Sequence, residues 1–167
     1  MGALEEVVYL MEEAFRGRGI EETNESQSLL ANLATVDDTS WRALPSVGSR
    51  TIESIVLHVG SCKIMYDEYA FGPGRRSWDD PALVPWLEGQ APRADSIQWL
   101  TEAHERLLEH VRALEDGDLP RLRLANWGEQ RETRWLLSTL LQHDTYHAGE
   151  INHLRALTTS DDAWKWG

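Results

Sequence analysis

The sequence predicts an all-α protein built as an antiparallel four-helix bundle. Apolar residues recur every three or four positions along most of the chain, and no long stretch shows the strict alternation typical of strands. Glycine and proline clusters separate the helical stretches. With 167 residues, of which 41% are hydrophobic, the chain has the size of one domain that buries a core without disulfides. We therefore expect a single domain over residues 1–167.

The predicted helices follow one another with clear breakers between them. The first ends at the glycines of RGRG, the second before Pro45, the third at FGPG and the fourth at DGDLP. A tail at 158–167 follows the fifth. The last four helices form the predicted bundle, and the first is an extra N-terminal helix. The helices are expected over residues 3–15, 25–43, 51–71, 96–115 and 131–157.

The segment 72–94 separates two of these helices. It carries four of the six prolines and shows little periodicity, so we expect a long crossover loop. Loops of this length often have a function, and we expect this one to form a wall of the functional site, with Trp78 and Trp86 as aromatic contacts. The connection RLRLANWGEQ, at 121–130, alternates only weakly and is interpreted as a loop.

Charge and composition exclude several classes of partner. Sixteen basic and 28 acidic residues give a formal charge of −12, which repels phosphate backbones and anionic lipids. We therefore expect no nucleic acid and no membrane among the partners. The single cysteine cannot form an internal disulfide, and the acidic start MGALEEVVYL is unlike a secretory signal, so we expect a cytoplasmic protein. The eight tryptophans would suit the interface of a homodimer.

The helix predicted at 131–157 interrupts a leucine stripe with ionisable residues. Spacings of three and four place them on one inward face: Leu136, Leu140, His143, His147, Glu150, Leu154 and Leu157. A buried polar side chain without a partner costs roughly 1 to 3 kcal/mol, so something must satisfy these groups. Imidazoles four residues apart on a helix project side by side and can share one divalent metal ion.

A third histidine is expected on an inward face of another helix. His58 lies three residues after Ile55 and four before Cys62, which places it on the apolar face of its helix. Facing helices are about 8–10 Å apart, so His58, His143 and His147 can reach one ion. Three protein ligands leave a position open for water or substrate, as in catalytic zinc sites. The alternative is that each histidine is a core residue bonded to a carbonyl or a carboxylate.

The neighbouring candidate residues have several interpretations. Glu150 lies roughly 20° from His143 around the helix axis. It can be a metal ligand, a general base that takes a proton from water, or an acceptor that orients an imidazole. Cys62 is expected to pack near the metal as a neutral thiol. Three further residues are expected on solvent-exposed faces: His104, His110 and Asp144.

Two rival metal sites fit the sequence less well. HDTYHAGEINH has the histidine spacing of the metzincin proteases, but that motif requires Glu and Gly where Asp144 and Glu150 stand. On a continuous helix its last histidine, His153, also points about 80° away from His143. A ferritin-like dinuclear site requires Glu-x-x-His units on two helices, and only Glu150 with His153 qualifies. We therefore prefer the three-histidine site.

The residues of this site resemble the DinB/YfiT family of metal-dependent enzymes. The resemblance rests on TIESIVLHVGSCKIMYDEYAFG and HDTYHAGEINHLRAL, and it extends from SLLANLATVDDTSWRALP through LRAL. It implies a DinB-like bundle with a long crossover and a three-histidine site for a divalent metal ion. We expect zinc or nickel there, with iron or manganese as alternatives. His58, His143 and His147 match the family's ligand positions, and Glu150 stands where relatives often carry Gln.

The resemblance also implies an activity. Relatives with a known activity include thiol S-transferases that use mycothiol or bacillithiol and a thiol-dependent maleylpyruvate isomerase. One hypothesis is therefore an enzyme with a small-molecule substrate. It is either a transferase that aims a low-molecular-weight thiol at an electrophile, or a hydrolase in which Glu150 takes a proton from water at the metal. The alternative is a non-catalytic metal-binding bundle that serves as a binding or scaffold protein.

Overall fold

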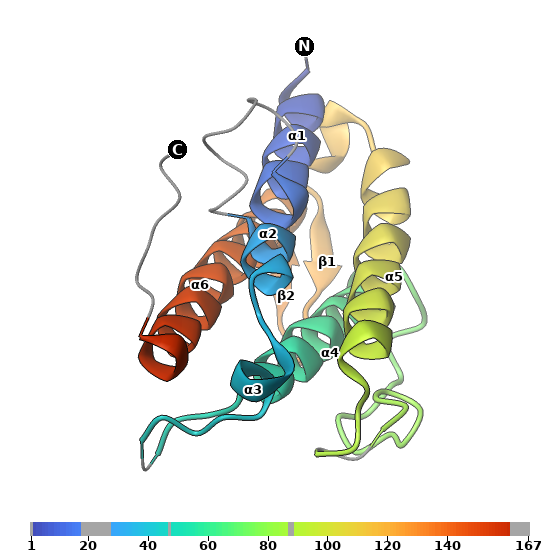
Figure 1. Ribbon diagram of the computed structural model, residues 1–167. Coiled ribbons are helices and arrows are strands. Elements are labelled where there is room, and N and C mark those ends of the chain that lie inside the picture. The colour runs from blue at the N-terminus through green and yellow to red at the C-terminus, as the bar shows by residue number, and fades with distance from the viewer. Residues whose placement is uncertain (1, 18–27, 47, 87–88, 161–167) are drawn as a thin grey trace.

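The computed structural model describes residues 2–17, 28–46, 48–86 and 89–160, and the chain in these ranges is mostly helical (Figure 1). The predicted all-α class is confirmed. In chain order the helices are α1 (Ala3–Arg16), α2 (Leu29–Ala34), α3 (Asp38–Trp41), α4 (Ile52–Ala70), α5 (Arg93–Arg112) and α6 (Thr133–Thr159). A short 3-10 helix (Asp116–Asp118) and two strands, β1 (Leu122–Leu124) and β2 (Gln130–Glu132), lie between α5 and α6.

Helices α1, α4, α5 and α6 form the bundle. Both α4 and α1 pack against α5 and α6, and α2 packs against α1 and α6. In Figure 1, α2 lies below α1, so the two together run alongside α6. Helix α1 is held against the other helices by its apolar stripe, because Leu4, Met11 and Phe15 are buried.

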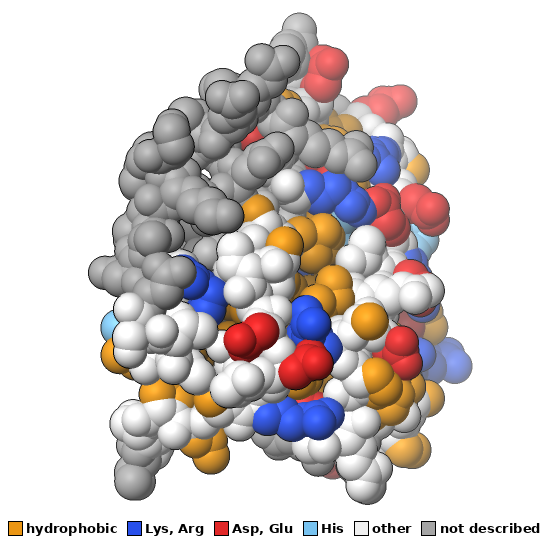
Figure 2. All heavy atoms as spheres, in the orientation of Figure 1, with side chains coloured by type: hydrophobic (Ala, Val, Ile, Leu, Met, Phe, Trp, Pro, Cys, Tyr) orange, Lys and Arg blue, Asp and Glu red, His pale blue; other side chains and the backbone are white. Residues whose placement is uncertain are grey.

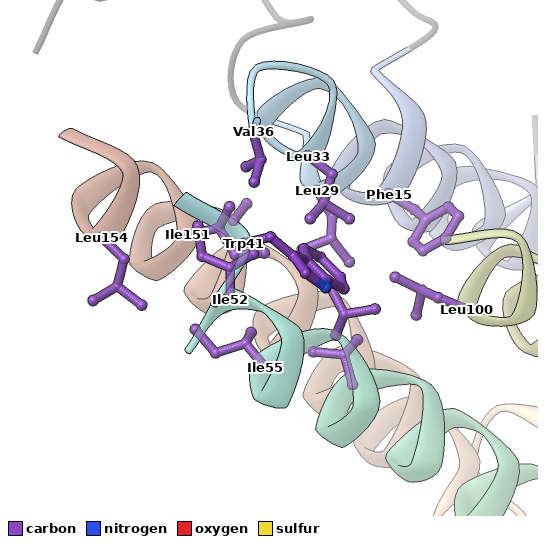
Figure 3. Packing of buried hydrophobic residues seen from close by; sticks show 13 residues of the cluster. Phe15, Leu29, Leu33, Val36, Trp41, Ile52, Ile55, Leu100, Ile151 and Leu154 are labelled. Atoms are coloured by element: carbon purple, nitrogen blue, oxygen red, sulfur yellow. The ribbon is translucent and has the colours of Figure 1, made fainter. Parts of the chain in front are cut away.

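The apolar core consists of two clusters of buried residues. The first lies where α2, α3, α4 and α6 meet (Figure 3) and contains Phe15, Leu29, Leu33, Val36, Trp41, Ile52, Ile55, Val56, Val59, Leu100, Ala148, Ile151 and Leu154. The second joins α1, α5 and α6 and contains Leu4, Met11, Leu107, Leu108, Val111, Leu137 and Leu140. On α6, residues 141–147 lie between the two clusters, so the bundle is packed on both sides of the predicted histidine pair.

The predicted helix 25–43 is broken in the structure. α2 ends at Ala34, and α3 begins at Asp38. The Asp37 carboxylate accepts a 2.7 Å hydrogen bond from the amide of Ser40 and so caps a new helix. The prediction of one continuous helix was therefore wrong. The apolar spacing continues past Asp37, but the side chain of Asp37 caps a separate helix.

The connection 121–130 forms a β-hairpin with the start of the next segment, so its interpretation as a loop was wrong. β1 and β2 pair antiparallel, with Leu122 opposite Glu132 and Leu124 opposite Gln130. Gly128, with φ of 90°, provides the left-handed backbone that the turn needs. Strands of three residues are too short for their alternation to be recognised in the sequence.

The ends of two predicted segments fall partly outside the described ranges. Residues 25–27 of the predicted second helix and residues 161–167 of the tail are outside. α6 continues to Thr159, so the tail begins two residues later than expected. The crossover between α4 and α5 contains no helix or strand in its described residues, 71–86 and 89–92, as expected. None of the described helices combines the length and apolar composition that crossing a membrane requires.

Side chains of opposite charge lie close together on the surface. Figure 2 shows basic side chains next to acidic ones on the face turned to the viewer. Arg93 Nε lies 2.8 Å from Asp38 Oδ1, and Arg76 Nη1 lies 3.3 Å from Asp80 Oδ2. Because acidic residues exceed basic ones by twelve, these pairs leave an excess of negative charge distributed over the chain.

His104 on α5 is fully buried, so the expectation of an exposed position was wrong. Its ring stacks on Phe15 with centroids 3.7 Å apart and planes within 3°. Among the described residues, neither ring nitrogen has a hydrogen-bond partner. Burial, followed by the positive charge of Lys63 and of two arginines, lowers the pKa of His104 to about 2. The ring is therefore a neutral group of the core.

His104→Leu should make folding less sensitive to acid. Below the ordinary histidine pKa the unfolded chain binds a proton at this position and the folded chain does not, so the wild-type protein loses stability as pH falls. The substitution should remove a loss of roughly 2 kcal/mol between pH 7 and pH 5. Urea unfolding of both proteins at the two pH values measures the difference. Equal losses in the two proteins would contradict this assignment.

Candidate metal centre

A buried ion pair holds α4 and α6 side by side. Lys63 Nζ donates to Asp144 Oδ2 at 2.7 Å, and the two side chains are only 1% and 2% exposed. Lys63 lies five residues after His58 on α4, and Asp144 directly follows His143 on α6. The pair therefore sets the register in which the histidine of α4 faces those of α6. The expectation that Asp144 faces solvent was wrong.

Three imidazoles converge near this ion pair. His143 Nε2 lies 3.1 Å from His58 Nε2 and 3.2 Å from His147 Nε2. One nitrogen of each histidine lies within 4.8 Å of the other two. His147 is buried, His143 is half-buried and His58 is exposed, so the cluster opens to solvent at His58. The structure thus brings together the three histidines that the sequence singled out, although His58 lies at the rim rather than on a buried face.

Glu150 orients the buried member of the cluster. Its Oε2 accepts a 2.8 Å hydrogen bond from His147 Nδ1, and its Oε1 lies 3.2 Å from Arg50 Nε. Because Nδ1 carries the proton, Nε2 of His147 keeps its lone pair and directs it at the other imidazoles. Arg50, which directly precedes the N-cap residue of α4, was not singled out from the sequence.

The environment keeps the three imidazoles neutral. Burial, followed by the other two histidines, lowers the pKa of His143 to about 3. Burial, followed by His58 and Arg50, lowers the pKa of His147 to about 4. Burial and then Arg50 also lower the pKa of His58. Neutral imidazole is the form in which histidine binds metals.

This donor set fits a divalent metal ion. Two tetrahedral nitrogen ligands about 2.0–2.1 Å from zinc are about 3.3 Å apart. The observed separations of 3.1 and 3.2 Å are close to that value. His143 Nε2 lies within hydrogen-bond distance of both His58 Nε2 and His147 Nε2, but a single N–H can be donated to only one acceptor. One metal ion would accept a lone pair from each of the three nitrogens. Imidazole ligands suit zinc, nickel and iron.

The remaining candidates lie around the cluster or away from it. Cys62 Sγ is 3.8 Å from both ring nitrogens of His58, and burial raises the pKa of this thiol to about 11. The thiol therefore packs beside the centre in its neutral form, as expected. His153 and His110 are exposed and, among the described residues, are not part of the metal-ligand cluster. The metzincin arrangement, which would need His153, is therefore absent from this part of the chain.

Lys63→Met alone should destabilise the fold by about 3–5 kcal/mol, because it leaves the Asp144 carboxylate buried without its partner. The double variant Lys63→Met with Asp144→Leu should recover most of this loss, since it removes both charges. Arg134→Met, which breaks an exposed ion pair with Glu132, should cost less than about 1 kcal/mol and is the control. Urea unfolding measures all three. A single variant as stable as the double would contradict the role assigned to the pair.

His143→Ala and His147→Ala should each remove most of the bound metal, because each deletes one of the three converging nitrogens. Glu150→Ala should weaken metal binding by about 10–100-fold, since it removes the acceptor of the hydrogen bond that orients His147. His110→Ala is the matched control and should bind metal normally. Zinc titration with a competing chelator gives the affinities. Full occupancy in His143→Ala would refute the site.

Comparison with known proteins identifies the family of this chain. A family model described as the DinB superfamily matches residues 21–151. This range contains α2 to α5, the hairpin and the three histidines, and it begins after α1. A search of curated proteins finds no match. Since the family match covers more than half of the sequence, the chain belongs to the DinB superfamily.

Proposed function

We propose that this protein is a metal-dependent enzyme that transfers a low-molecular-weight thiol to a small electrophilic substrate. The observation that carries this proposal is the solvent-exposed position of His58 beside two less exposed ligands. Structural zinc sites are closed by four protein ligands, whereas catalytic sites have three and keep one position open. The open side of this centre is where a thiol and its electrophile would enter.

A divalent ion on the three histidines would supply a positive charge that lowers the pKa of a thiol or water at the open position. Because the imidazoles are neutral, they leave that charge uncompensated. In the transfer, the thiol loses its proton to solvent, and its sulfur forms a bond to the electrophilic carbon while the leaving group departs. Cys62 is not a member of the three-nitrogen cluster, and burial raises the pKa of its thiol to about 11.

The contacts of Glu150 favour the transferase over the hydrolase. One carboxylate oxygen accepts from His147 and the other faces Arg50, so both are already engaged. A general base needs a free oxygen directed at the water molecule. We assign Glu150 the role of a positioning residue that acts through His147. Thiol transfer does not require a base of this kind, because a thiol loses its proton far more readily than water does.

One aromatic side chain contacts the centre, and three more lie about two helical turns away along α4 and α6 or in the turn of the hairpin. The Tyr146 ring meets His147 edge to face at 5.0 Å. Tyr66 lies eight residues beyond His58 on α4 and contacts the ring of Trp127 at 6.0 Å. Trp127 in turn lies 5.9 Å from Trp135, and both tryptophans are nearly half exposed. These rings support a substrate with an apolar or aromatic body.

A cobalt-substituted protein tests the open position. Addition of 2-mercaptoethanol should produce an intense thiolate-to-cobalt charge-transfer band, since the added sulfur can occupy the free site. Dimethyl sulfide, which cannot form a thiolate, should not. The Cys62→Ala variant should give the same band and is the control against ligation by the protein's own thiol. An unchanged spectrum at saturating thiol would contradict the transferase proposal.

The fold should survive removal of the metal, which separates the enzyme from a metal-stabilised scaffold. Two apolar clusters pack the bundle on both sides of the histidines, and a chain of this size does not need a metal to fold. After chelation, circular dichroism at room temperature should retain nearly all of the helical signal. Loss of most of that signal would favour the scaffold.

A further inference from the structure

A pocket lies between the crossover and α5. It has a volume of about 310 Å³ and is lined by Pro85, Trp86, Asp95, Gln98, Trp99 and Glu102. None of the three histidines contributes to it. Trp86, which was expected to line the metal centre, contacts Trp99 of α5. The volume is at the lower end of the range for small-molecule sites, about 300–1,000 Å³.

Two indole rings form a corner of this pocket. The rings of Trp86 and Trp99 lie with their centroids 6.4 Å apart and their planes at 83°. Trp99 is seated on Gly60 of α4, where a Cβ atom would come within 2.3 Å of the ring. A side chain at that position would push the indole away, so the glycine fixes one aromatic wall. The two rings meet edge to face, and both belong to the lining of the pocket, where an indole face that stays open is a negatively polarised surface.

The polar lining of the pocket is acidic. Asp95 and Glu102 are seven residues apart on α5, hence on one side of the helix and about 10.5 Å apart along its axis. Within the described residues neither carboxylate forms an ion pair, whereas the neighbouring Arg93 is paired with Asp38. Gln98 lies between them and donates a 2.9 Å hydrogen bond to Glu102. Carboxylates this far apart cannot bind one metal ion, but they can flank a larger cation.

We propose that this pocket binds a small organic cation, a quaternary or alkylated ammonium group. Such a group is weakly hydrated and is attracted by the quadrupole of an indole face that borders the pocket. The two carboxylates add long-range attraction without requiring a short contact. The site is separate from the metal centre and does not depend on the proposed transferase activity.

Choline and its uncharged analogue 3,3-dimethylbutan-1-ol test the proposal, because they have the same shape and differ in charge. The indole N–H signals of Trp86 and Trp99, assigned in nuclear magnetic resonance spectra through Trp86→Phe and Trp99→Phe, report binding. Choline should shift both signals saturably. The neutral analogue should bind at least roughly fivefold more weakly. Equal affinities for the two compounds, or no saturable shift with choline, would overturn the proposal.

Three variants locate the site. Trp86→Leu, on the crossover, should abolish saturable choline binding. Glu102→Gln, on α5, should weaken choline binding several-fold. Glu109→Gln, an exposed acid on α5 outside the pocket, removes the same charge and should leave the affinity unchanged. His143→Ala should also bind choline normally, since the metal centre is separate. Equal weakening by Glu102→Gln and Glu109→Gln would show that only the net charge attracts the cation.

Discussion

The buried contact between Lys63 and Asp144 positions the helices on which the candidate metal centre depends. Apolar packing holds α4 and α6 together, and a charge pair removed from water adds the requirement that both partners meet in one register. Lys63 Nζ and Asp144 Oδ2 meet at 2.7 Å, and both side chains are almost completely buried. Since each residue lies close in sequence to a histidine of the cluster, the register that joins the charges also brings the imidazoles together.

Next to this ion pair, the histidines of the centre range from buried, at His147, to exposed, at His58. His147 is held through Glu150 to Arg50, and the residues that follow it on α6 join the first apolar cluster. His58 lies at the opposite side and is exposed. The same arrangement predicts a fold that does not rely on a metal, because the clusters on either side of the histidines consist of apolar residues. A site with a fixed inner side and an accessible outer side suits chemistry on a small molecule.

Periodicity in the sequence predicted the long helices and the three histidines, because an apolar stripe of several turns has a strong and specific spacing. It failed where one residue or a long-range contact decides the outcome. The carboxylate of Asp37 starts a new helix within an apolar stretch. Asp144 is buried only because Lys63 lies opposite on another helix, and no local pattern reports such a pair. His104 is different, since its spacing of four and three from Leu100 and Leu107 already indicates an inward position, and the expectation of an exposed residue overlooked it.

X-ray absorption spectroscopy of the zinc-loaded protein observes the three-histidine centre itself, because it reports the ligands of the ion and does not depend on activity. We expect three imidazole nitrogens at about 2.0–2.1 Å, one exchangeable light atom and no protein sulfur. The multiple-scattering features of imidazole should diminish by one third in His58→Ala. A spectrum with a sulfur ligand from Cys62, or with four protein ligands that leave no exchangeable position, would contradict an open three-histidine centre.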